Sequence, residues 1–266
     1  MKKTILFLSV FILTAMIFIS FASAQSSGYR GQSINGSTGL FSIPTGRVGW
    51  EDPGKTGIDL GYRAVINNDA GIAHIPAITA SFLNWAELSA AFDIQPENSD
   101  LMLGIKIKLP FSKTTSFVIG GSAQFIHINS SNSYNAYQPY IAITYSGNLF
   151  AMPSETTIIF GKTIYSGREN NTNIDFGMGF DLILFPDVFD EFLHWIIDFA
   201  NFSYSDNSWP LNSSQNRGVV NTGFRIDLAA FPSLSNFKLL VDFIFNDLFD
   251  AGSRSFTVGG VLGFKL

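Results

Sequence analysis

The end of the chain alternates strictly between two kinds of side chain. Across residues 256–266, every second position is apolar or glycine, and the positions between them are small or polar except for one valine. Successive side chains of a β-strand point to opposite faces, so this stretch predicts a strand with one apolar face. Such a face is suited either to a protein core or to lipid.

The same alternation recurs through most of the chain. It predicts twelve strands, at residues 56–67, 75–83, 86–95, 101–111, 117–125, 137–146, 156–165, 174–184, 193–200, 220–228, 237–246 and 256–266. The seventh is the least regular, because Lys162 shares a face with Ile158 and Phe160, and a β-bulge would restore its phase. Residues 147–155 are predicted to be a connector. Segments of about ten residues with alternating hydrophobicity are typical of transmembrane β-barrels.

We therefore predict an all-β fold, a closed antiparallel transmembrane β-barrel of about 12 strands that occupies residues 56–266. Closure is required because unpaired backbone groups are costly in lipid. Strand counts of ten or fourteen, a soluble β-sandwich and a soluble lipid-binding barrel are the alternatives. Two rims of aromatic residues support the membrane prediction. The outer rim would contain Phe92, Phe125, Tyr137, Tyr165, Tyr204, Phe245 and Phe256.

The first 24 residues have the pattern of a signal peptide. Lys2 and Lys3 precede a long apolar run, and Ala22-Ser23-Ala24 forms an A-x-A cleavage site. An uncleaved membrane helix is the alternative, since the apolar run is long enough to be marginal. A cleaved signal followed by a barrel predicts the bacterial outer membrane. The chain has no cysteine, which excludes a lipoprotein anchor, disulfides and thiolate metal sites.

The face opposite the apolar one predicts the lumen. Both signs of charge occur there, which suits either solute selection or a wall cross-linked by ion pairs. The lumen-facing candidates are Asp59, Arg63, Glu87, Asp93, Lys106, Lys108, Asp175, Asp181, Asp198, Arg225, Asp227, Lys238 and Asp242. A lipid-binding cavity should be apolar, so these charges argue against the soluble barrel.

Other functional classes are less well supported. The formal net charge is −5, which argues against nucleic acid as a partner. His74, His127 and His194 are scattered, so we predict no metal site and no cofactor. No serine is expected within reach of His127 on the lipid face, and the chain is therefore predicted not to be an enzyme.

Residues 25–55 precede the first predicted strand. Glycine and proline fix turns there, and Leu40, Phe41 and Ile43 need a place to be buried. This segment is predicted to plug the lumen or cap its periplasmic mouth, with a loose tail as the alternative. Thr38-Gly39-Leu40 followed by Pro44-Thr45 resembles the opening of outer-membrane barrel proteins associated with exopolysaccharide production. That resemblance implies a link to surface polysaccharide.

The function that these features favour is a porin-like channel, narrow or partly occluded, for small polar solutes. The alternative is a non-conducting structural or assembly protein of the envelope. The expected partners are outer-membrane lipid, the barrel assembly machinery through the C-terminal strand, and small polar solutes.

Overall fold

The structure is a computed structural model that describes residues 30–51, 54–67, 71–95, 98–109, 111–112, 114–128, 133–167, 172–204, 218–230, 237–249 and 254–266. The predicted signal peptide lies outside these ranges. The strands are β1 (Gly57–Asn67), β2 (Gly71–Phe82), β3 (Ala86–Ile94), β4 (Ser99–Leu109), β5 (Thr115–Ile126), β6 (Tyr134–Leu149), β7 (Met152–Gly161), β8 (Ile164–Ser166), β9 (Asp175–Ile183), β10 (Leu193–Ala200), β11 (Val219–Asp227), β12 (Lys238–Asn246) and β13 (Ser255–Lys265). Helix α2 (Pro186–Phe189) and the 3₁₀ turn η1 (Leu228–Ala230) are short connectors.

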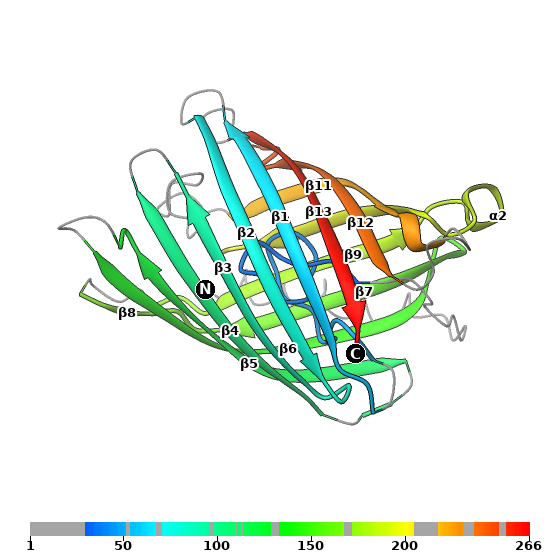
Figure 1. The fold of residues 1–266 in the computed structure, drawn as a ribbon, viewed down its shortest axis with the longest axis horizontal. Coiled ribbons are helices and arrows are strands. Elements are labelled where there is room, and N and C mark those ends of the chain that lie inside the picture. Colours follow the sequence, from blue (N-terminus) through cyan, green and yellow to red (C-terminus); the bar gives the residue numbers. More distant parts are fainter. Residues whose placement is uncertain are drawn as a thin grey trace, which may run out of the picture.

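The strands form one closed antiparallel barrel (Figure 1). Neighbours in sequence pair all the way round, and β1 pairs with β13 from Gly57↔Lys265 to Asn67↔Ser255. The short strand β8 continues β7 along β6, so the wall has twelve strands and one extension. The predicted twelve-stranded barrel is thereby confirmed. We call the end that holds Gly57 and Lys265 the terminal end, and the opposite end the far end.

Two local predictions for the seventh strand are wrong. Gly147, Asn148 and Pro153 have the composition of a loop, yet they pair in the β6–β7 ladder and leave only Phe150 and Ala151 as the turn. The β-bulge is also absent, because β7 and β8 keep one continuous register against β6. Lys162 is accommodated near the far end, where its ammonium donates to the carbonyl of Asn173 at 2.7 Å.

The outside of the barrel is an apolar surface. Large side chains exposed around it include Leu60, Ile78, Leu88, Ile105, Ile119, Ile141, Phe160, Trp195, Phe224, Phe243 and Leu262. They come from eleven different strands, and the residues next to them along each strand face inward. An apolar outer surface all round a closed barrel is suited to lipid, so the wall is that of a transmembrane β-barrel. No described helix is both long and apolar enough to cross a membrane.

Two aromatic residues do not belong to the predicted outer rim. Tyr165 and Tyr204 are buried rather than exposed on the lipid face. Because the β7 register continues into β8, Tyr165 falls on the same inward face as Ile159. Tyr204 follows the end of β10 and lies inside the far end of the lumen, against Gln138.

The interior contains the start of the chain. Residues 31–50 are buried throughout, and Figure 1 shows this segment, in blue, coiled within the ring of strands. We call residues 30–51 the inner segment. Its apolar side chains Ile34, Leu40, Phe41 and Ile43 form one cluster with inward residues of the wall.

Candidate functional site: the filled lumen

The inner segment enters the lumen and returns as a folded loop. Isolated bridges join Gln32 to Thr38 and Gly39 to Pro44, so the backbone doubles back on itself. At its two ends, Arg30 and Glu51 lie 3.7 Å apart as an ion pair. The segment therefore begins and finishes at the same mouth of the barrel.

The tip of the inner segment binds a wall carboxylate. Asp198 on β10 accepts hydrogen bonds from the backbone amides of Phe41 at 2.8 Å and Ser42 at 2.7 Å, and from the Ser42 hydroxyl at 2.9 Å. A fourth donor is the side-chain amide of Asn221 on β11, at 2.7 Å. A buried carboxylate is costly unless it is hydrogen-bonded, and here most of the donors come from the segment.

A second wall carboxylate holds the middle of the segment. Glu87 on β3 accepts from the Thr38 amide at 2.8 Å, the Thr38 hydroxyl at 2.5 Å and the Gly49 amide at 3.0 Å. Lys106 on β4 lies 3.1 Å from Glu87 and donates to the carbonyls of Thr38 and Arg47. Glu87 and Lys106 therefore bind both the part of the inner segment that enters the lumen and the part that returns to the mouth.

The returning end is fixed to β1 and β12. The indole of Trp50 donates to Asp59 at 2.7 Å, and the ammonium of Lys238 lies 2.7 Å from the other oxygen of the same carboxylate. Lys238 also donates to the carbonyl of Gly49 and lies 5.3 Å from the centre of the Trp50 ring. Charge, hydrogen bonding and a cation–π contact therefore act at one point.

A chain of alternating charges runs along the wall beside the segment. Arg63 donates to the carbonyls of Gln32 and Ser33 and lies 3.6 Å from Asp242. Arg225 binds Asp242 through two nitrogens, at 2.7 and 3.2 Å, and lies 3.7 Å from Asp181.

His194 extends that chain. Its Nδ1 lies 2.6 Å from the Asp181 carboxylate, and the side chain is buried on the inner face of β10. This histidine therefore has a place in the wall network, whereas the imidazole of His74 lies outside, against the Tyr62 hydroxyl. No group of residues suited to a metal ion occurs in the described ranges.

A group of five charges lies at the terminal mouth, and we call it the mouth cluster: Arg30, Arg47, Glu51, Lys108 and Glu155. Arg30 and Arg47 lie 3.0 and 3.2 Å from Glu155, and Lys108 lies 2.8 Å from Glu51. Burial acts to raise the pKa of Glu51, but the charges of Arg30, Arg47 and Lys108 overcome it and hold that pKa below its ordinary value. Glu51 is therefore ionised in the cluster at neutral pH.

The wall makes room for the segment with glycine. A Cβ added at Gly179 would lie 2.5 Å from Leu40 Cδ1, and one added at Gly177 would lie 2.8 Å from Ile43 Cγ2. Since real Cβ contacts do not come this close, a side chain at either position would require neighbouring atoms of the segment or of the wall to shift.

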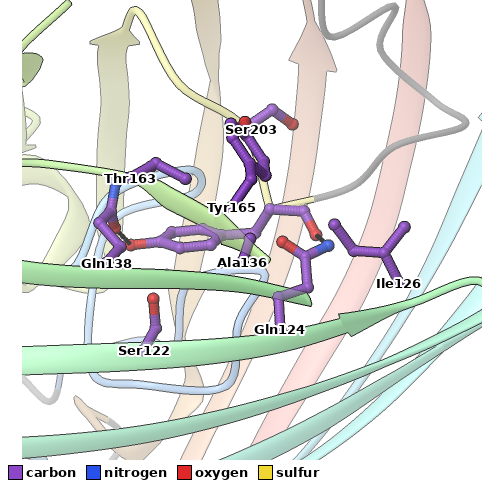
Figure 2. Close-up of a pocket in the computed structure, with 9 residues that line it drawn as sticks. Ser122, Gln124, Ile126, Ala136, Gln138, Thr163, Tyr165 and Ser203 are labelled. Carbon is purple, nitrogen blue, oxygen red and sulfur yellow. Dashed lines mark hydrogen bonds between the residues drawn. The ribbon is translucent and has the colours of Figure 1, made fainter. Parts of the chain in front are cut away.

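Figure 2 shows the side chains that line a small cavity towards the far end of the lumen. A cavity of about 20 Å³ is lined by Gln124, Gln138, Tyr165 and Tyr204 among others, which is room for about one water molecule. The Tyr204 hydroxyl donates to Gln138, and Gln138 donates to Asp175 at 2.7 Å. The polar groups at this end therefore bind one another across the lumen.

The predicted lumen-facing residues fall into three groups in the structure. Most contact the inner segment or one another, and all of these are buried except the partly buried Asp181: Asp59, Arg63, Glu87, Lys106, Asp181, Asp198, Arg225, Lys238 and Asp242. Lys108 is partly exposed in the mouth cluster. The last three lie apart from the segment and bind local partners: Asp93 accepts from Gln95, Asp175 from Gln138 and Thr163, and Asp227 from the amide of Ala229.

Several participating residues were missed in the sequence. Arg30, Arg47 and Glu51 lie in a stretch without periodicity, and Glu155 was placed in a connector. Asp100 was not singled out because the fourth predicted strand began at residue 101, whereas β4 begins at Ser99 and the alternation from Lys106 then places Asp100 inside. It accepts hydrogen bonds from Gln124 and from the backbone amide of His127.

Comparison with known proteins gives the fold. No protein-family model and no curated protein sequence matches this chain. Among solved structures, the KdgM porin aligns with a TM-score of 0.51 and 12% identity, over 77% of this chain and 98% of that one. The NanC porin aligns with a TM-score of 0.50 and 11% identity, over 79% of this chain and 100% of that one. The chain thus has the fold of outer-membrane porin barrels, with residues 31–50 buried inside the ring of strands.

Proposed function

We propose that the protein is a porin-like channel of the bacterial outer membrane for small polar solutes, and that the inner segment occludes its lumen. The apolar outer surface and the closed barrel support the membrane location. The lumen-facing charges would line the path when the segment moves aside. In this role the protein is not an enzyme, and its wall selects solutes by their size and charge.

The observation that carries the proposal is the chemistry between segment and wall. Beside its apolar cluster, the segment is bound by hydrogen bonds and ion pairs to Asp198, Glu87, Lys106 and the mouth cluster. Water can replace such polar partners when the segment moves aside, so the net stabilisation from each of these contacts is modest. The fold shared with the KdgM and NanC porins, which are porins by name, supports the same role.

The test is single-channel conductance of the refolded mature protein in a planar bilayer, beside a variant that lacks residues 25–53. We expect brief openings in the full protein and steady conductance in the shortened one. Heat-modifiable gel mobility serves as the control that each barrel has folded. Silence in both folded proteins would refute the channel and favour the non-conducting envelope role.

Two finer expectations belong to this proposal. The C-terminal strand β13 would engage the barrel assembly machinery, as the strand that closes the ring against β1. The resemblance of Thr38-Gly39-Leu40 and Pro44-Thr45 to exopolysaccharide-associated barrels would place the channel beside surface polysaccharide. Loss of surface polysaccharide in a deletion strain, restored by the intact gene, would support that link, and an unchanged surface would contradict it.

A further inference from the structure

Basic and acidic side chains of the inner wall have different kinds of partner. The basic side chains Arg63, Lys106, Lys108, Arg225 and Lys238 each lie within 4 Å of a carboxylate. Asp175 and Asp198, in contrast, have only neutral donors among the described residues: amides, hydroxyls and backbone N–H groups. Neither carboxylate therefore forms an ion pair with a described basic residue, and the charge of Arg225 acts on Asp198 only from beyond ion-pair distance.

These two carboxylates lie towards the far end of the lumen. Asp175 is the first residue of β9, and Asp198 is close to the far end of β10. In Figure 2, Gln138, whose amide donates to Asp175, lies at the cavity beyond the inner segment. A solute entering from the far end would meet Asp175 first and Asp198 next.

The inner segment masks the second of these groups. Three of the four donors to Asp198 come from Phe41 and Ser42, and only Asn221 belongs to the wall. When the segment withdraws, Asp198 loses three of its four hydrogen-bond donors. A carboxylate in that condition binds cationic donors, because N–H groups that carry positive charge replace the lost ones most strongly.

We propose that the opened lumen prefers cations, and that Asp175 and Asp198 set this preference. The inference rests on the proposed channel and names the class of solute that it passes. Carboxylates that line a low-dielectric path raise the local concentration of cations and exclude anions. While the channel is closed, N–H donors at the tip of the inner segment occupy Asp198. The tip therefore competes with cations for this carboxylate.

The test is the reversal potential of the full mature protein across a KCl gradient, with Asp175→Asn and Asp198→Asn compared with the unaltered chain. Asparagine keeps the size of the side chain and removes its charge. We expect cation preference in the unaltered chain and a shift of the reversal potential towards zero in each variant. Asp198→Asn should also open more often, since it weakens the contact with the segment, whereas Asp175→Asn should not.

The matched control is Asp187→Asn, which removes one carboxylate from the exposed connector helix α2 outside the lumen and should leave the reversal potential unchanged. Anion preference, or reversal potentials that both lumen variants leave unchanged, would overturn the inference while leaving the channel intact. A change confined to the opening frequency of Asp198→Asn would overturn it as well. Silence of every variant in folded form would overturn the channel itself and the inference with it.

Discussion

The indole of Trp50 donates a hydrogen bond of 2.7 Å to the carboxylate of Asp59, and this contact fixes the end of the inner segment to the first strand of the barrel. Both residues are almost fully buried, at 2% and 1% exposure. The segment is thereby fixed to the wall within a few residues of the point where the wall begins.

Trp50→Phe should loosen the segment and destabilise the barrel. Phenylalanine keeps an aromatic ring near Lys238 but cannot donate to Asp59, and leaving a buried acceptor without its donor costs about 1–3 kcal/mol. The measurement is the urea midpoint of the gel-mobility shift. Trp195→Phe is the control, because Trp195 lies on the outer surface. Equal midpoints for the two variants would contradict the importance of this contact.

Ile105→Arg and Phe243→Arg should each impair membrane insertion. Both side chains are exposed on the outer surface near the middle of their strands, at 50% and 37% exposure. Arginine at the midplane of a membrane barrel costs about 2–4 kcal/mol, and the cost falls to about 0–1 kcal/mol near the interfaces. The yield of folded protein in lipid vesicles measures the effect of each substitution on insertion.

Ile66→Arg, at the end of β1, is the control for these two changes and should insert almost normally. Normal insertion of both midstrand variants would show that the outer surface does not meet lipid.

Acidification should release the inner segment. The pKa of Glu51 is held below its ordinary value, so its ion pairs stabilise the closed state fully above about pH 4.5, and this stabilisation is lost as the pH falls through the lowered pKa. Open probability should therefore rise on acidification into that range. In Glu51→Gln it should already be raised at neutral pH and change less with acid. If the open probability of the unaltered protein did not change with pH, the ion pairs of the mouth cluster would not be what holds the inner segment in the lumen.

A disulfide should lock the channel shut. A Cβ at Gly177 would lie 2.8 Å from Ile43 Cγ2, which brings cysteines at these two positions within the span of a disulfide. Since the chain has no cysteine of its own, the pair Ile43→Cys with Gly177→Cys reports on one contact alone. Oxidation should abolish conductance and reduction should restore it.

The controls for the lock are the two single cysteine variants, which should not respond to reductant. Conductance that persists in the fully oxidised double variant would mean that the path does not run past the tip of the segment.

The barrel was predictable because its signal is local. A strand that faces lipid on one side and a polar interior on the other must alternate, and the alternation at residues 256–266 or 237–246 reports this without knowledge of any partner. Glu155 shows where the signal fails. Gly147 and Pro153 weaken the pattern around it, and only pairing with β6 and β9 reveals a strand.

The arrangement inside the lumen was not predictable in the same way. The segment has no periodicity, and its contacts join residues far apart in the chain, as in the hydrogen bond between Phe41 and Asp198 across 157 positions. Leu40, Phe41 and Ile43 indicate that the segment needs burial. They do not indicate which wall residues contact the segment. Those contacts depend on how the pairing of the twelve strands places distant side chains at the same level of the lumen.

The ion pair between Arg30 and Glu51 has a topological consequence. Since both ends of the inner segment lie at one mouth, residues 30–51 enter and leave the barrel as a single loop. Such a loop can move out along the barrel axis and return while every strand pair of the wall stays intact.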